Sequence, residues 1–169
     1  MTDPVPRPCD IPDEFTRFRH PLSNLAKQFA GRGPIKIVAI GSSSTEGVGG
    51  IVPYPYRLEM ALRDRFKNHD PKWMIDVLNR GKGGEEAPIE LKRFDTDVLA
   101  EHPSLVIWQV GANAIFHNDQ FDVDDVGAKI ATGLSQLQDL PMDVVLMDMQ
   151  YAPALVGADK IKLPSAWGR

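Results

Sequence analysis

The sequence predicts an α/β protein in which helices cover both faces of a parallel sheet, giving a three-layer α/β/α sandwich. Two observations favour this class: short apolar runs rich in β-branched residues alternate with helical stripes, and no hairpin signal joins one run to the next. The composition agrees, because 169 residues that are 43% hydrophobic and 25% charged are typical of a compact globular protein. The runs predicted as strands are 35–40, 73–78, 104–110 and 143–149.

The first 31 residues are predicted as a tail and helical segment ahead of a single α/β domain over residues 32–169. Residues 1–12 contain four prolines, and from Phe15 to Phe29 apolar side chains recur at helical spacing. Pro21 would interrupt one continuous helix, so a second helix is expected to begin there and to end at Gly31. Further stripes predict helices between the strands, within 58–66, 87–98 and 123–137.

Charge and composition exclude several classes of function. The net charge of -4 provides no basic field for nucleic acid. No apolar run approaches the roughly 18 residues of a transmembrane segment, and the N-terminus has acids and prolines where a secretory signal would be basic and then apolar. We therefore expect a cytoplasmic protein. The single cysteine, Cys9, cannot form a disulfide within the chain or a cysteine-rich metal site, and no metal or cofactor is expected.

Three loops at the carboxyl ends of predicted strands carry the candidate functional residues, because ligands of such sheets bind beyond these ends. The loop at 41–50 offers serine hydroxyls as nucleophiles, the loop at 79–86 offers glycine N–H groups to a negative charge, and the loop at 111–119 offers an asparagine amide. A fourth loop begins at Gln150. Taken singly, each loop also fits a structural role. The serines could cap the next helix, the glycines could form a flexible connection, and the asparagine could stabilise its own turn.

Together, these loops resemble the SGNH hydrolases, the GDSL-like esterases and acylhydrolases. The family patterns Gly-Asp-Ser-x-x-x-Gly, Asn-x-Gly-x-x-Gly and Gly-x-Asn-Asp fall on residues 41–47, 79–84 and 111–114. The resemblance implies a flavodoxin-like sandwich of the SGNH type and a small-molecule substrate, an acyl or acetyl ester. It also implies that Ser43 is the nucleophile and an oxyanion donor, and that Gly84 and Asn113 are the other oxyanion donors.

The sequence departs from the family pattern in three places. Ser42 and Ala114 stand where aspartate is usual, and neither position has a catalytic role in the family. The third departure concerns the family's last block, Asp-x-x-His, which supplies the acid and base of the triad and has no match before Arg169. The last strand and helix are therefore expected to be missing. This favours a truncated or frameshifted member, or one completed by another chain.

Without this block, the base that takes the proton of the serine hydroxyl must be sought among the four histidines of the sequence. His117 is the only histidine in a predicted crevice loop, so it is the candidate substitute base. His20, His69 and His102 are expected in surface or capping positions.

Two alternatives to an esterase follow from the same residues. Without its base, the chain could be a catalytically silent ligand-binding domain on this fold. A phosphate-binding site at the first loop is the weaker alternative, because the loop lacks both the Gly-Lys-Ser/Thr ending and the Gly-x-Gly-x-x-Gly spacing. The sequence sets no oligomeric state, although an exposed edge of the fourth strand would favour self-association.

Overall fold

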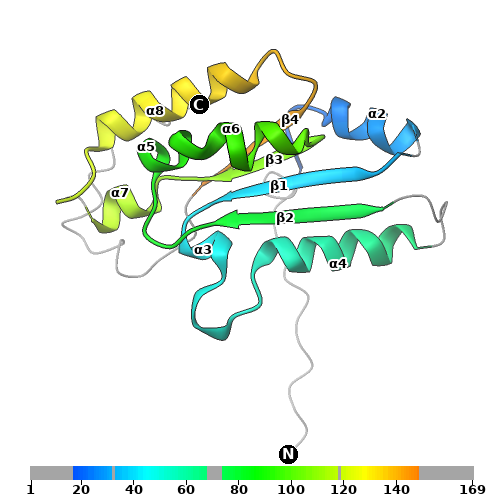
Figure 1. Ribbon diagram of the computed structural model, residues 1–169, viewed down its shortest axis with the longest axis horizontal. Helices are drawn as coiled ribbons and strands as arrows, with labels where there is room; N and C mark the ends of the chain where they lie inside the picture. Colours follow the sequence, from blue (N-terminus) through cyan, green and yellow to red (C-terminus); the bar gives the residue numbers. More distant parts are fainter. Residues whose placement is uncertain (1–16, 32, 68–73, 118, 149–169) are drawn as a thin grey trace, which may run out of the picture.

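A computed structural model describes residues 17–31, 33–67, 74–117 and 119–148 and shows an α/β/α sandwich around a parallel sheet (Figure 1). Four strands pair in the order β2-β1-β3-β4. The predicted fold class is thereby confirmed, whereas the expected loss of a further strand and helix concerns residues outside the described part. The strands are β1 (Ile35–Gly41), β2 (Ile75–Gly81), β3 (Leu105–Gln109) and β4 (Asp143–Met147).

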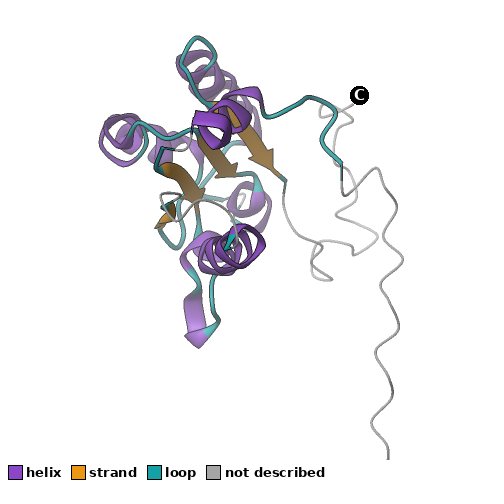
Figure 2. Cartoon of the chain, turned by 90° about the vertical axis from the view of Figure 1, so that its right-hand side faces the viewer, coloured by secondary structure: helices purple, strands orange, loops and turns teal. Residues whose placement is uncertain are grey.

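Helices cover both faces of the sheet (Figure 2). One face packs against α2 (Ser23–Gly31) and α4 (Tyr54–Phe66), and the other packs against α5 (Ala87–Glu90), α6 (Phe94–Asp97) and α8 (Val123–Leu137). Two short helices, α3 (Ser43–Glu46) and α7 (Ala112–Phe116), follow β1 and β3 directly. Three 3-10 turns complete the described elements: η1 (Val48–Gly50), η2 (Leu91–Arg93) and η3 (Leu99–Glu101). None of the helices in the described ranges is long and apolar enough to cross a bilayer.

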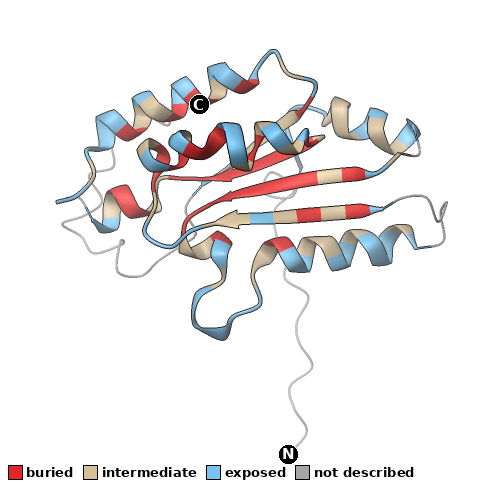
Figure 3. Cartoon of the chain, in the orientation of Figure 1, coloured by how far each residue is buried: buried red, intermediate tan, exposed pale blue. Residues whose placement is uncertain are grey.

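The central strands are buried on both sides, as their uninterrupted apolar runs predict (Figure 3). Alternate side chains of β1 enter different cores: Ile37 joins the core under α2 and α4, whereas Val38 joins the core under α5, α6 and α8. Trp108 of β3 is fully buried in the second core, where its ring meets that of Phe94 edge-on at a centroid distance of 4.8 Å. These two cores fix the positions of the strand ends.

Two predicted boundaries are wrong. The stripe at 87–98 is not one helix but consists of α5, η2 and α6, and its backbone leaves helical geometry at Arg93, between η2 and α6, and at Val98, where α6 ends. The second loop does not begin at Asn79, because β2 pairs with β1 as far as Gly81 opposite Gly41. The loop therefore begins at Lys82, and its glycines lie beyond the strand rather than within a long connection.

The strand order creates a crevice at the carboxyl ends of β1 and β3. After β1 the chain adds β2 on one side of β1 and then returns to place β3 on the other side. Connections leave these two neighbouring strands in opposite directions, which opens a gap above their ends. The first and third predicted loops flank this gap.

Candidate active site

Ser43 occupies the crevice between β1 and β3. It is the first residue of α3, and the preceding Ser42 has an extended backbone that turns the chain out of β1. Ser43 is half-buried and lines a cavity of about 280 Å³, which we call the switch-point cavity. Asn113, Gln109, Tyr54, Phe116 and Asp148 also line this cavity. The structure thus brings Ser43 and Asn113, two of the predicted site residues, to one cavity.

The second loop lies against α3, which places its glycines beside Ser43. Gly81 permits this approach, because a Cβ there would overlap the backbone of Glu46. The Gly83 N–H donates to Glu46 Oε2 at 2.7 Å, and the Asn79 side chain donates to the Glu46 carbonyl at 3.3 Å. A Cβ on Gly83 would lie 3.8 Å from that of Ser43. The loop that carries Gly84 is therefore held next to the candidate nucleophile.

Gln109, which the sequence analysis did not single out, organises the start of α3. Its side-chain oxygen accepts hydrogen bonds from the Ser42 N–H at 3.3 Å, the Ser42 hydroxyl at 3.2 Å and the Thr45 hydroxyl at 3.3 Å. All three residues are buried. This arrangement explains why serine fits at position 42. An aspartate carboxylate has no hydrogen to donate, so it would face the Gln109 oxygen as a second acceptor.

The three predicted oxyanion donors differ in how they are held. Asn113 is 8% exposed. One N–H of its side-chain amide donates to the Glu85 carbonyl at 2.7 Å, and the second N–H is available to a ligand in the cavity. Gly84 has a φ of +79°, a conformation that favours glycine. The backbone N–H groups of Ser43 and Gly84 donate to no other residue in the described part of the chain. All three donors thus retain a free N–H.

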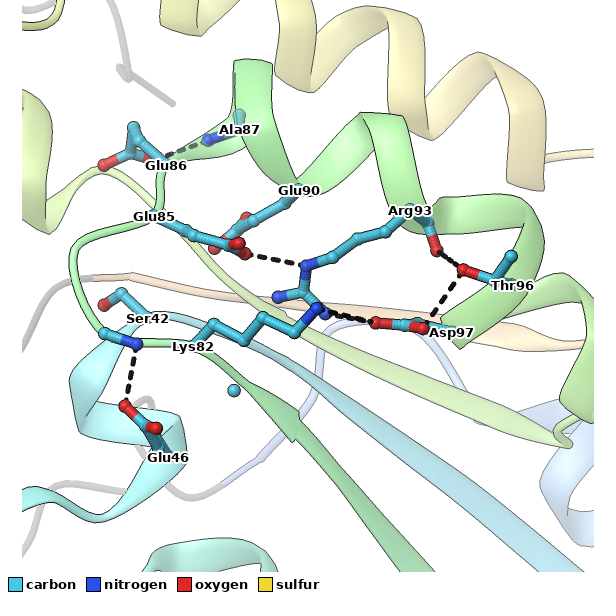
Figure 4. A network of polar contacts seen from close by, with 12 residues as sticks. Ser42, Glu46, Lys82, Glu85, Glu86, Ala87, Glu90, Arg93, Thr96 and Asp97 are labelled. Carbon is cyan, nitrogen blue, oxygen red and sulfur yellow. Dashed lines mark hydrogen bonds and ion pairs between the residues drawn. The ribbon is translucent and has the colours of Figure 1, made fainter.

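A buried acidic cluster lies behind the second loop (Figure 4). Glu86 and Glu90 are 1% and 0% exposed. Burial raises the pKa of Glu90 to about 8, against the lowering effect of the Trp108 indole N–H, which donates to Glu90 at 2.6 Å. Glu85 instead pairs with Arg93 at 2.7 Å. The sequence analysis placed Glu85 and Glu86 in a loop and Glu90 in a predicted helix, and it gave no sign that Glu86 and Glu90 are buried.

The described histidines differ in their distance from the crevice. His102 is exposed in a left-handed conformation just before β3, at the end of the sheet opposite Ser43. His20 is exposed ahead of α2, whose first turn bonds to Asp143 at the beginning of β4. His117 follows α7 at the crevice end; it is exposed and is not among the residues lining the switch-point cavity. His69 lies outside the described residues.

A second cavity of about 370 Å³ is also lined by Ser43. We call it the loop cavity, because the segment between α3 and α4 forms it. Val48, Ile51 and Val52 line it and are 56%, 66% and 46% exposed, and Arg57 lies at the same cavity. Within the described ranges, no three histidine, cysteine or acidic side chains are grouped to hold a metal ion.

Comparisons with known proteins identify the family of the chain and confirm its fold. The model of a non-GDSL lipase-like family matches residues 8–161. No curated protein matches the sequence significantly. Among solved structures, an acetyl-xylooligosaccharide esterase from Geobacillus stearothermophilus is 21% identical, with a TM-score of 0.55 over 68% of this chain and 60% of its own. A protein assigned to the G-D-S-L family of lipolytic proteins, from Desulfitobacterium hafniense, is 26% identical, with a TM-score of 0.55 over 70% and 62%. The chain thus spans about three fifths of their lengths.

Proposed function

Because the chain belongs to the non-GDSL lipase-like family, we propose that it is a serine esterase of the GDSL-like type, with Ser43 as its nucleophile. The observation that carries the proposal is the meeting of Ser43 and Asn113 at one cavity, with the Gly83–Gly84 turn beside Ser43. The structural neighbours support it: in the Geobacillus esterase, replacements of a serine and of a histidine by alanine are described as catalytic mutants.

In the proposed reaction, the Ser43 hydroxyl attacks the carbonyl carbon of a carboxylic ester and its proton passes to a base. The carbonyl oxygen becomes an oxyanion and accepts hydrogen bonds from the N–H groups of Ser43 and Gly84 and from the free N–H of Asn113. Collapse of this intermediate releases the alcohol and leaves an acyl group on Ser43, which water then hydrolyses. The loop cavity would hold the acyl group, because its apolar side chains lie next to Ser43.

The base determines how fast this reaction runs. In a comparable serine hydrolase, loss of the base lowers kcat by about 10⁶, whereas loss of one oxyanion donor lowers it by about 10² to 10³. Among the described histidines, His117 is the candidate, since it alone lies at the crevice end of the sheet. If His117 is the base, His117→Ala should abolish turnover, while His102→Ala should leave it unchanged.

Covalent labelling of Ser43 tests the nucleophile directly. A fluorophosphonate probe should label the wild-type chain and fail to label Ser43→Ala. Ser44→Ala, which changes the neighbouring serine on the same helix, is the matched control and should still be labelled. Absence of labelling in a folded, concentrated wild-type sample would reject Ser43 as a nucleophile.

The second candidate function is a silent domain that binds ester-like ligands without cleaving them. The exposed position of His117, outside the cavity that Ser43 lines, favours it. Such a domain would bind an ester analogue at the switch-point cavity and show no turnover above that of Ser43→Ala. Ester hydrolysis that vanishes in Ser43→Ala would exclude it.

A further inference from the structure

Glu86 is a buried carboxylate that joins the second and third loops. It lies directly before α5 at 1% exposure, and its two oxygens accept three backbone N–H groups. Oε1 accepts from Ala87 at 3.1 Å and from Gly111 at 2.8 Å, and Oε2 accepts from Ala114 at 3.1 Å. Gly111 and Ala114 flank the turn that carries Asn113. No lysine, arginine or histidine of the described ranges forms an ion pair with Glu86.

A second link joins the same two loops, here from a side chain of the third loop to the backbone of the second. The Asn113 side chain donates to the carbonyl of Glu85, the residue directly before Glu86, at 2.7 Å. Gly84, the other proposed donor, directly precedes Glu85. The two links therefore connect the loops that carry the residues proposed to bind the oxyanion, and a movement of one loop alone would break these hydrogen bonds.

We infer that Glu86 is the positioning residue of the proposed oxyanion hole, through which the Asn113 turn is held in register with Gly84. This inference rests on the proposed function. Glu86 does not touch the substrate; it acts through Gly111 and Ala114 on the Asn113 amide. A shift of about 1 Å in such a group costs about 10²-fold in rate, so a rigid link between the two donors has a direct catalytic consequence.

Only a carboxylate satisfies the three N–H groups that surround this position. It offers two acceptor oxygens, and its charge strengthens each hydrogen bond. A glutamine has one acceptor oxygen, so its NH₂ group would face at least one backbone N–H, leaving that N–H buried without a partner. Glu86→Gln is therefore almost identical in size, and it weakens the link by removing the charge and one of the two hydrogen bonds to the third loop.

The experiment compares Glu86→Gln with Glu59→Gln as a matched control. Glu59 also accepts a hydrogen bond from a backbone N–H, that of Val77 at 2.8 Å, but it lies on α4, away from the crevice. Both variants replace a charged acceptor of a backbone N–H by a neutral one, and Glu59→Gln also removes the ion pair between Glu59 and Arg63 at 3.1 Å. The measurements are the rate of fluorophosphonate labelling at Ser43, kcat and KM for a p-nitrophenyl ester, and amide hydrogen exchange.

We expect Glu86→Gln to lower the labelling rate and kcat by about 10- to 100-fold with KM changed less than about threefold, because donor alignment matters most in the transition state. At least one of the Gly111 and Ala114 amides should exchange faster in this variant, because the glutamine side chain has only one acceptor oxygen. In Glu59→Gln the amide oxygen can still accept from the single Val77 N–H, so exchange at Gly111 and Ala114 and the labelling rate should both stay at the wild-type values. Glu86→Asp, which keeps the charge but is one methylene too short to reach both turns, should fall between wild type and Glu86→Gln.

The outcomes separate this inference from the proposed function. A folded Glu86→Gln chain that is labelled as fast as wild type would reject the positioning role and leave Ser43 as the nucleophile. An unlabelled wild-type chain would reject Ser43 and, with it, any catalytic role for Glu86. If Glu86→Gln does not fold, exchange in the wild type decides: rapid exchange at Gly111 and Ala114 would overturn the inference, and protection there with intermediate labelling of Glu86→Asp would support it.

Discussion

Glu90→Gln should stabilise the protein at neutral and alkaline pH. Glu90 is fully buried, one of its oxygens has no hydrogen-bond partner in the described part of the chain, and the other accepts from Trp108. Burial raises the pKa of Glu90 from 4.5 to about 8, so the folded chain keeps this carboxyl protonated at neutral pH. A glutamine is neutral at every pH and can still accept from the indole N–H.

The size of the effect follows from the two pKa values. Between pH 4.5 and about 8 the unfolded chain releases the Glu90 proton and the folded chain retains it. Folding therefore binds a proton in this window, and the free energy of unfolding falls as pH rises. The slope is about 1.4 kcal/mol per pH unit, which amounts to about 4 to 5 kcal/mol across the window. Above pH 8 both states are ionised, and the loss is complete.

Denaturant unfolding of wild type and Glu90→Gln at pH 5, 6, 7 and 8 measures this effect. The difference in unfolding free energy should grow in favour of the variant at each step. Glu101→Gln is the control, because hydrogen bonds from Lys36 and Arg80 hold the pKa of Glu101 below its usual value. Its difference from wild type should be constant from pH 6 to 8. If the unfolding free energies of wild type and Glu90→Gln changed in parallel with pH, Glu90 would not have a raised pKa in the folded chain.

Three further substitutions test two close backbone approaches and the proposed binding site of the acyl group. Gly81→Ala should push α3 away from β2, lowering the free energy of unfolding by about 1–3 kcal/mol and slowing the labelling of Ser43. Gly133→Ala should lower the melting temperature through a similar cost, because its Cβ would lie 2.5 Å from the Trp108 ring, but the folded variant should be labelled normally. Ile51→Asp should reduce kcat/KM for hexanoyl esters roughly tenfold more than for acetyl esters, since a buried apolar contact contributes about 1.5–3 kcal/mol; equal reductions would place the acyl group elsewhere.

Much of the fold could be predicted from apolar periodicity. The runs at 35–40 and 104–110 are buried on both faces, and their length and β-branched content distinguish them from helices. The stripe at 123–137 matches α8 at both ends, since Asp122 caps it through the Asp125 N–H. The boundary at Gly81 was missed because glycine usually ends a strand, whereas here it extends one so that α3 can approach closely.

The candidate site could be predicted only as a set of loops. The order of Ser43, Gly84 and Asn113 along the chain carries the family pattern, and parallel strands bring their ends to one edge. The links between the loops leave no such pattern, because they depend on the register between the ends of β1, β2 and β3. A glutamate in a polar loop is usually solvated, so nothing in the sequence distinguishes Glu86 from Glu85.

Two buried glutamates, Glu86 directly before α5 and Glu90 at its end, differ in the hydrogen bonds that they accept. Glu86 and Glu90 lie four residues apart, and the negative charge of Glu86 is one of the effects that raise the pKa of Glu90. Three N–H groups converge on Glu86, whereas a single indole N–H reaches Glu90. Glu86 therefore holds the loops through hydrogen bonds to both of its oxygens, whereas burial raises the pKa of Glu90 to about 8 and keeps its proton in place at neutral pH. The same change to glutamine, one helical turn apart, should consequently have opposite signs at pH 8: destabilising at Glu86 and stabilising at Glu90.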